Sequence, residues 1–218
     1  MTRSQESPNP GRRLPSVESV VDAVAPYVTD LNLIPPRETP EWLQHLAVPA
    51  GWQIVHLDTG SIQPTRTAVT GPRGDGGWDG CETLSVYRFT GAPPRSVVFE
   101  NNDCTLRGLG GESLTTHMLT APAGQKVCAV RSTGYFTAAG RRMWAQYSTY
   151  VVDGRTPGGS WLALHGLFVS ADSRAGLRDD VTALSDAVHE EFLTAVVTVN
   201  AEAPTVPIPV TEAHPHGS

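Results

Sequence analysis

The fold of this chain is decided by residues 126–169, which read KVCAVRSTGYFTAAGRRMWAQYSTYVVDGRTPGGSWLALHGLFV. Val127–Phe136 and Arg142–Val152 are rich in β-branched and aromatic residues, the types that favour strands. A short turn separates the two segments, which is typical of a β-hairpin. Trp161–Val169 follows after a link rich in Gly and Pro. The stretch therefore predicts three consecutive antiparallel strands.

Alternation of side chains divides these strands into two faces of different character. The simplest register closes the turn around Ala139 and Gly140 by pairing Phe136 with Arg141. An apolar face then carries Cys128, Val130, Gly134, Phe136, Met143, Ala145, Tyr147, Val151, Leu162, Leu164 and Phe168, and an aromatic face carries Arg131, Thr133, Tyr135, Arg142, Trp144, Gln146, Ser148, Tyr150, Trp161, His165 and Leu167. A slip of one residue would exchange the faces. Neither face is cleanly polar, so we expect helices or loops to cover part of both.

Length and composition predict one domain, residues 16–202, between two disordered polar tails, residues 1–15 and 203–218. The net charge of -6 and the absence of a basic cluster argue against binding of nucleic acid. No apolar run is long enough for a transmembrane segment. The first residues lack the apolar core of a signal peptide, which leaves the localisation unknown: the protein is cytoplasmic, is exported by a non-classical route, or has lost a leader.

The three cysteines, Cys81, Cys104 and Cys128, do not have the spacing of a zinc site. Small buried thiols are the favoured interpretation. A disulfide between Cys104 and Cys128 is the alternative, and it would imply an oxidising compartment.

The rest of the chain predicts elements around the three strands. Ser16 is a candidate N-cap for a helix over Val17–Leu31 with a kink at Pro26. A flexible surface loop is expected over Thr59–Gly80, and a final helix begins near Asp172 or Ser173. The shorter predicted elements are a helical turn at Glu41–Leu46 and strands at Trp52–Leu57, Thr83–Phe89, Ser96–Cys104 and Ser113–Thr120. The final helix carries an apolar stripe of Leu177, Val181, Leu184, Val188, Phe192 and Ala195.

No catalytic, cofactor or metal motif stands out. His189 and Glu190 lie on the predicted final helix, but no second histidine follows four residues later, so they do not form a zinc-protease motif. His165 could titrate near neutral pH, although a histidine on a strand is more often simply hydrogen-bonded. The sequence therefore predicts neither a metal site nor a bound cofactor.

Pro49-Ala50-Gly51-Trp52 forms a short turn motif between the predicted first helix and the strands. With this motif and the order of its elements, the chain from about residue 26 to 197 resembles the actinobacterial LpqN/LpqT lipoprotein family. The resemblance implies a PsbP-like fold, which is an antiparallel sheet between helices, and a non-catalytic, envelope-associated protein with links to glycolipid handling. It supplies no catalytic residue, and the chain lacks the family's signal peptide and lipidation cysteine near residue 1.

We therefore predict an α+β fold with a single antiparallel β-sheet of about five to seven strands, packed between an N-terminal helix and a long C-terminal helix that lies across the apolar face. The predicted ligand-binding residues lie on the aromatic face and are Arg131, Trp144, Gln146, Tyr150 and His165. The favoured function is a non-catalytic binding protein for a lipid-like, glycolipid-like or other amphipathic molecule, or for a protein partner. The alternatives are an enzyme with a site around Arg131 and His165, and an adaptor that acts only through protein contacts. Burial of the aromatic face under the first helix would remove its residues from the site.

Overall fold

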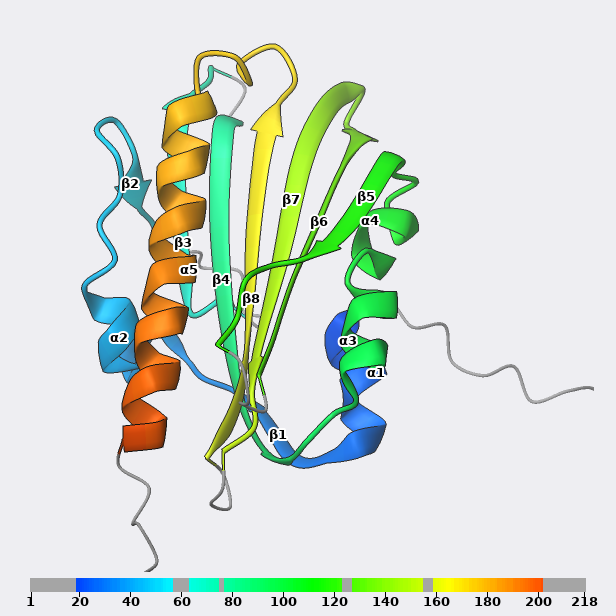
Figure 1. Ribbon diagram of the computed structural model, residues 1–218. Helices are drawn as coiled ribbons and strands as arrows, with labels where there is room; N and C mark the ends of the chain where they lie inside the picture. Colours follow the sequence, from blue (N-terminus) through cyan, green and yellow to red (C-terminus); the bar gives the residue numbers. More distant parts are fainter. Residues whose placement is uncertain (1–18, 57–62, 75–76, 123–126, 155–158, 202–218) are drawn as a thin grey trace, which may run out of the picture.

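The computed structural model describes residues 19–56, 63–74, 77–122, 127–154 and 159–201 (Figure 1). The predicted tails, residues 1–15 and 203–218, and the predicted N-cap Ser16 lie outside the described residues. The predicted boundaries of the domain therefore stay predictions.

A large antiparallel sheet forms the centre of the molecule, and the α+β fold is confirmed. The strands are β1 (Val28–Leu33), β2 (Gln53–Ile54), β3 (Arg66–Pro72), β4 (Trp78–Gly91), β5 (Glu112–Met118), β6 (Val127–Ala138), β7 (Arg141–Val152) and β8 (Ser160–Ser170). Their order is β2-β3-β4-β8-β7-β6-β5, and β1 pairs with β4 beside this path. The described part of the chain thus contributes eight strands, where we expected five to seven.

The β6–β7 hairpin closes more tightly than the simplest register. Phe136 lies opposite Met143, and only Ala139 and Gly140 form the turn, with φ angles of 48° and 74°. Two positive φ angles in a two-residue loop are typical of the type I′ turn, whose twist matches the strands. Since the register differs from the expected one by two residues, the two faces keep their predicted members.

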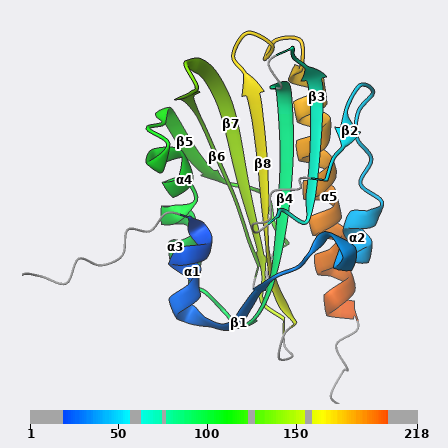
Figure 2. The same cartoon turned by 180° about the vertical axis from the view of Figure 1, so that it is seen from behind.

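Helices cover both faces, and Figures 1 and 2 show them on opposite sides of the sheet. The long helix α5 (Arg178–Ala201) packs on the aromatic face, where Val188 and Phe192 contact the cluster around Tyr150. The short helices α1 (Val20–Val24), α3 (Arg95–Asn101) and α4 (Cys104–Gly108) pack on the apolar face.

The prediction that the final helix lies across the apolar face is therefore wrong. On the aromatic face the stripe of α5 buries Val181 and Leu184 against Trp144 and Leu167, and Val188 and Phe192 against Tyr150.

Three other element predictions need correction at the N-terminal half of the chain. The first helix is only α1, capped by the Ser19 side chain, and a 3₁₀ turn (Ala25–Tyr27) and β1 follow it. Pro26 cannot donate a helical hydrogen bond, which ends the helix where a kink was expected. Within the predicted loop Thr59–Gly80 lies β3, whose Thr67–Thr70 segment is buried and pairs with β4.

The remaining corrections concern helices. The predicted strand Ser96–Cys104 is mostly α3, because Val98 turns inward against the cluster of α1 instead of pairing in the sheet. The last helix starts at Arg178, so neither Asp172 nor Ser173 caps it, and turns fill residues 171–177. A separate short helix, α2 (Glu41–Gln44), contacts α5 and agrees with the predicted helical turn.

All three cysteines are free thiols, and Cys104 and Cys128 are buried. The interpretation as buried thiols therefore holds for Cys104 and Cys128, whereas Cys81 is half-buried, and the alternative disulfide is not formed. None of the described helices is both long and apolar enough to cross a membrane.

Irregular pairing occurs in two strands at the margins of the sheet. In β1 the register shifts between Thr29 and Asn32, where Asp30 has a φ of 57°. In β5 it shifts between Glu112 and Thr115, where Ser113 has a φ of 54°. These are β-bulges, which bend a strand and interrupt its row of hydrogen bonds.

Candidate functional site

A groove of about 720 Å³ lies between α5, the turns before it and the strands β6 and β7. Three of the five predicted ligand-binding residues, Arg131, Trp144 and Gln146, line it. The structure adds Tyr135 from β6, Arg174 from the turns and Arg178 from the first turn of α5. Pockets of this size accommodate a small molecule or the head group of a larger one.

Two aromatic rings of the groove lining, Trp144 and Tyr135, each contact a guanidinium group, and the one on Trp144 belongs to the lining residue Arg174. The guanidinium carbon of Arg174 lies 4.0 Å from the ring centre of Trp144, and that of Arg142 lies 4.8 Å from the ring centre of Tyr135. Such cation–π contacts orient an arginine while most of its N–H groups stay available. Trp144 itself is only 6% exposed, so it supports Arg174 from below and offers little open ring surface.

The remaining predicted groove residues are held by hydrogen bonds. The side-chain amide of Gln146 donates to Ser185 Oγ on α5 at 2.8 Å, and both residues are buried. Arg131 lines the groove and donates from Nε to Ser148 Oγ at 3.1 Å. These contacts tie the helix to the sheet and fix the depth of the groove.

The formal charge of the groove is opposite to that of the whole chain. Arg131, Arg174 and Arg178 line it against a single carboxylate, Asp186, which gives a formal local charge of +2 in a chain with -6. Among the described residues, neither Arg174 nor Arg178 forms an ion pair. A concave surface lined by one sign of charge concentrates counter-ions, so the groove favours anions.

Tyr150 and His165, the other two predicted site residues, lie beneath α5 and are completely buried. Tyr150 packs with its ring centre 5.0 Å from that of Phe192. Burial raises the pKa of the Tyr150 hydroxyl, and the nearby positive charge of Arg131 opposes this shift. Neither residue lines the groove in this conformation.

His165 belongs to a buried polar network. Its Nε2 lies 3.0 Å from Glu82 Oε1, and Glu82 Oε2 lies 3.2 Å from a terminal nitrogen of Arg66. This network serves a structural purpose under α5, because a charge in the core requires a partner.

The network is part of a line of side chains that crosses the aromatic face. The strand register places Arg66, Leu84, His165, Ser148 and Arg131 opposite one another on β3, β4, β8, β7 and β6. Four of these five residues are polar. We call these five residues, together with Glu82, the polar row. The row runs from Arg66 on β3 to the groove beside α5.

Catalysis around Arg131 and His165 has little geometric support in this arrangement. Ser148 lies between them in the row, and His165 has no exposed surface for a substrate. No cluster of three or more metal-ligating side chains occurs within the residues that the structure describes. The groove can bind an anion through the guanidinium groups that line it.

Comparison with known proteins supports the fold. No family model matches the sequence, and no curated protein matches it. The crystal structure of LpqN of Mycobacterium tuberculosis, described as involved in cell envelope biogenesis, matches with a TM-score of 0.56 at 15% identity, over 77% of this chain and 94% of that chain. An uncharacterized protein from Rhizobium leguminosarum has a TM-score of 0.19 at 10% identity, over 74% and 93% of the two chains, and carries no argument. The likeness to LpqN shows a shared fold.

Proposed function

We propose that this protein is a non-catalytic binding protein that holds the anionic head group of an amphipathic ligand in the groove beside α5. The proposal rests on the three arginines that line the groove, Arg131, Arg174 and Arg178. Asp186 is the carboxylate that lines it with them. Arginine binds phosphate and carboxylate groups through paired N–H donors, and a stacked guanidinium is already oriented for this task.

The ligand's apolar part has a place next to the head group. Ala171, Ala175 and Val181 contribute apolar surface to the groove, and Tyr135 is half-buried at its wall. Lipids and glycolipids with an acidic head group combine the two required properties. We also propose that the protein acts in the cell envelope. The fold that it shares with LpqN supports this part of the proposal. A protein partner with an acidic surface is the alternative occupant of the same groove.

The test uses a single-chain amphiphile with a phosphate head group. Calorimetric titration of the full chain with dodecyl phosphate, kept monomeric, should give saturable binding that weakens as salt is added. Dodecyl maltoside has the same tail and no charge, and it should bind about tenfold more weakly or worse, a difference of about 1.4 kcal/mol.

Charge-neutral variants locate the binding site. Arg174→Gln and Arg178→Gln should each weaken dodecyl phosphate binding by about tenfold, as expected for loss of one charge-assisted contact. Arg88→Gln is the matched control, because Arg88 is exposed on β4 and does not line the groove. Equal binding of the two amphiphiles, or equal losses in all three variants, would overturn the proposal. Binding of an acidic protein but of neither amphiphile would favour the alternative occupant.

A further inference from the structure

The groove beside α5 carries more positive charge than a singly charged anion can neutralise. Three guanidinium groups line it, from Arg131 on β6, Arg174 in the turns and Arg178 at the start of α5. None of the three forms an ion pair with a residue that the structure describes. Asp186 is the one carboxylate of this described lining, so the lining has a formal charge of +2.

The neutral polar groups of the lining are already engaged. Thr182 Oγ1 donates to the carbonyl oxygen of Arg178 at 3.0 Å, and Ser185 Oγ accepts from the side-chain amide of Gln146 at 2.8 Å. An anion in the groove is therefore bound mainly by guanidinium groups. Since these groups are charged, the strength of binding depends on the charge of the ligand.

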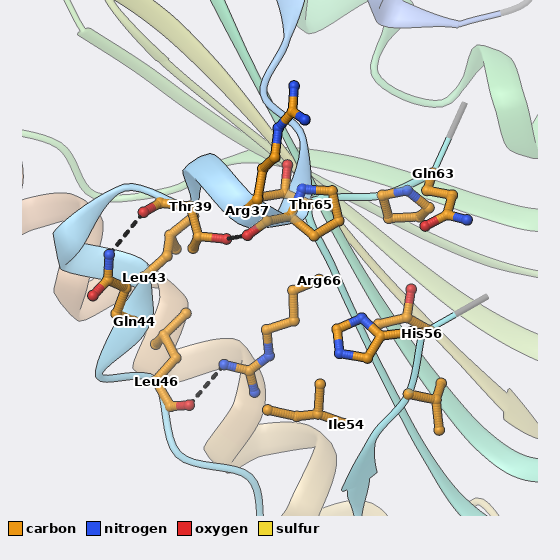
Figure 3. A pocket seen from close by; sticks show the side chains of 14 residues that line it. Arg37, Thr39, Leu43, Gln44, Leu46, Ile54, His56, Gln63, Thr65 and Arg66 are labelled. Atoms are coloured by element: carbon orange, nitrogen blue, oxygen red, sulfur yellow. Dashed lines mark hydrogen bonds between the residues drawn. The ribbon is translucent and has the colours of Figure 1, made fainter. Parts of the chain in front are cut away.

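The cavity of about 400 Å³ around Arg66 offers no such excess of positive charge (Figure 3). Arg66 donates to the carbonyl oxygen of Leu46 at 2.7 Å, and its other terminal nitrogen lies 3.2 Å from Glu82. Arg37, the second arginine of its described lining, pairs with Glu38 at 3.3 Å. Each of the two guanidinium groups has a carboxylate partner, so the groove beside α5 is the better-supported anion site.

We propose that the groove prefers a phosphate monoester in its doubly charged form over any singly charged head group. This inference rests on the proposed function and adds to it the class of the head group. A phosphate monoester carries about -1.5 to -2 charges near pH 7, with a second pKa of about 6. A phosphate diester, a sulfate ester or a carboxylate carries one negative charge, which leaves part of the positive charge of the groove unbalanced.

Dodecyl phosphate and its methyl ester test this preference on the full chain. The two molecules have the same tail, and the methyl group blocks the second ionisation of the phosphate. Calorimetric titration at pH 8 should give dodecyl phosphate binding that is about tenfold tighter than binding of the methyl ester. At pH 5, where both ligands carry close to one charge, the two affinities should agree within about twofold. Equal affinities at both pH values would overturn the inference.

His189 makes the comparison between the two ligands necessary. Its ring centre lies 5.9 Å from that of Tyr150. Burial and the charge of Arg131 lower the pKa of His189, and the charges of Asp186 and Glu190 oppose this shift. Protonation of His189 at low pH adds positive charge and strengthens the binding of either anion. The ratio of the two affinities removes this contribution, because the methyl ester has the same charge at both pH values.

Asp186→Asn tests whether the charge of the groove sets the preference. With three arginines and no carboxylate the formal charge of the lining becomes +3. At pH 8 this variant should bind dodecyl phosphate about fivefold more tightly and the methyl ester about twofold more tightly, because Coulomb energy is proportional to the charge of the ligand. Glu190→Gln is the matched control, because Glu190 is exposed on the same helix outside the groove. Equal effects of the two variants on dodecyl phosphate binding would overturn the inference.

The outcomes separate this inference from the proposed function. Equal binding of dodecyl phosphate and its methyl ester, both tighter than dodecyl maltoside, would reject the preference for a double charge and leave the amphiphile site intact. Binding of neither ester would reject the proposed function and the inference with it. Glycerol 1-phosphate has the same double charge without the tail, and it should bind more weakly than dodecyl phosphate. Equal binding of these two would reject the amphiphile and retain a small phosphate monoester as the ligand.

Discussion

Buried charge is concentrated in a few residues under α5. Arg66, Glu82 and His165 have 8%, 1% and 0% of their surface exposed. Glu82 lies between the other two, and Arg66 also donates to the carbonyl oxygen of Leu46. A buried ion pair contributes little net stability compared with apolar residues, whereas loss of one partner is strongly destabilising. Replacement of any one of these three residues should therefore lower the stability of the protein strongly.

Trp144→Ala should destabilise the protein strongly. The side chain is 6% exposed and packs with Leu167, Val181 and Leu184 beneath the start of α5. Its removal should lower the free energy of unfolding by about 3–5 kcal/mol, as for other buried Trp truncations. Urea unfolding measures this quantity, with Tyr135→Ala as a half-buried aromatic control on the same face. A loss below about 1 kcal/mol would mean that Trp144 is a surface residue of the groove.

Cys81 should be unreactive at neutral pH. Burial, aided by the negative charge of Glu82, raises its pKa to about 11. Only about one thiol in a thousand is then ionised at pH 8, and the thiolate is the nucleophile. Alkylation of native protein by iodoacetamide, located by peptide mass spectrometry, should accelerate about tenfold per pH unit up to this pKa. Rapid labelling of Cys81 at pH 8 without denaturant would contradict the assignment.

The candidate site was predictable only in part at this scale. Arg131, Trp144 and Gln146 were found because strand alternation places them on one face, and the same alternation included Tyr135 in that face. Tyr150 and His165 share the face but lie under α5, and alternation contains no information about which helix covers which residue. Arg174 and Arg178 were missed because they come from a turn and a helix end whose position depends on tertiary packing.

At the scale of elements, one turn attaches the start of α5 to the sheet. Gly51 has a φ of 85°, which favours glycine, and it directs Trp52 inward over Gly80. The Trp52 ring nitrogen donates to Asp180 at 3.0 Å in the first turn of α5. A Cβ atom at position 80 would lie 2.9 Å from the Trp52 ring, so Gly80 is needed for this packing. The Pro49–Trp52 motif thus serves as a docking point for the helix.

Leu184→Asp should unfold the domain or nearly so. Leu184 is 2% exposed in the middle of the α5 stripe, and an aspartate there would be a buried charge without a partner. Ala183→Asp is the matched control, because Ala183 is exposed one residue away on the same helix. Circular dichroism melting should show a loss of several kcal/mol, or no folded protein, for the first variant only. Two similar melting temperatures would show that the stripe does not face a core.

Elements with a clear period were predictable from sequence, and ambiguous ones were not. Strands β6, β7 and β8 and helix α5 combine length with regular patterning, which predicts the type of each element and which of its own residues share a face. The Val97–Phe99 run in α3 fits a short strand or a buried helix equally well, and packing against α1 decides between them. Strand β3 was hidden by its Gly-rich and Pro-rich surroundings, although its Thr and Val content favours a strand.

At the scale of the whole molecule, the sheet separates two cores. One lies between the sheet and α5, and the other lies between the sheet and α1, α3 and α4. The sequence predicted a sheet between helices but placed α5 on the wrong face. Both faces contain enough large apolar side chains to pack against a helix, so the composition of the faces does not predict which of them α5 covers.

Deletion of residues 1–15 and 203–218 should leave the stability nearly unchanged. Both segments are polar or rich in proline and contain few groups that could offset the entropy of ordering them. The truncated and full chains should therefore melt within a few degrees of each other in calorimetry, about what one kcal/mol would produce. A clearly lower melting temperature would show that a terminal segment docks on the fold and that the domain boundaries need revision.

The bulges described in β1 and β5 determine how the molecule meets its neighbours. Strand β2 is two residues long, and β1 and β5 are each interrupted by a residue with positive φ. A sheet margin that is short or kinked offers no continuous template to an incoming extended chain. Intermolecular strand addition, the common route to fibrils and to edge-on peptide capture, is thereby discouraged at β1, β2 and β5. A partner or ligand is therefore expected to bind on the faces of the sheet and its helices, where the groove beside α5 lies.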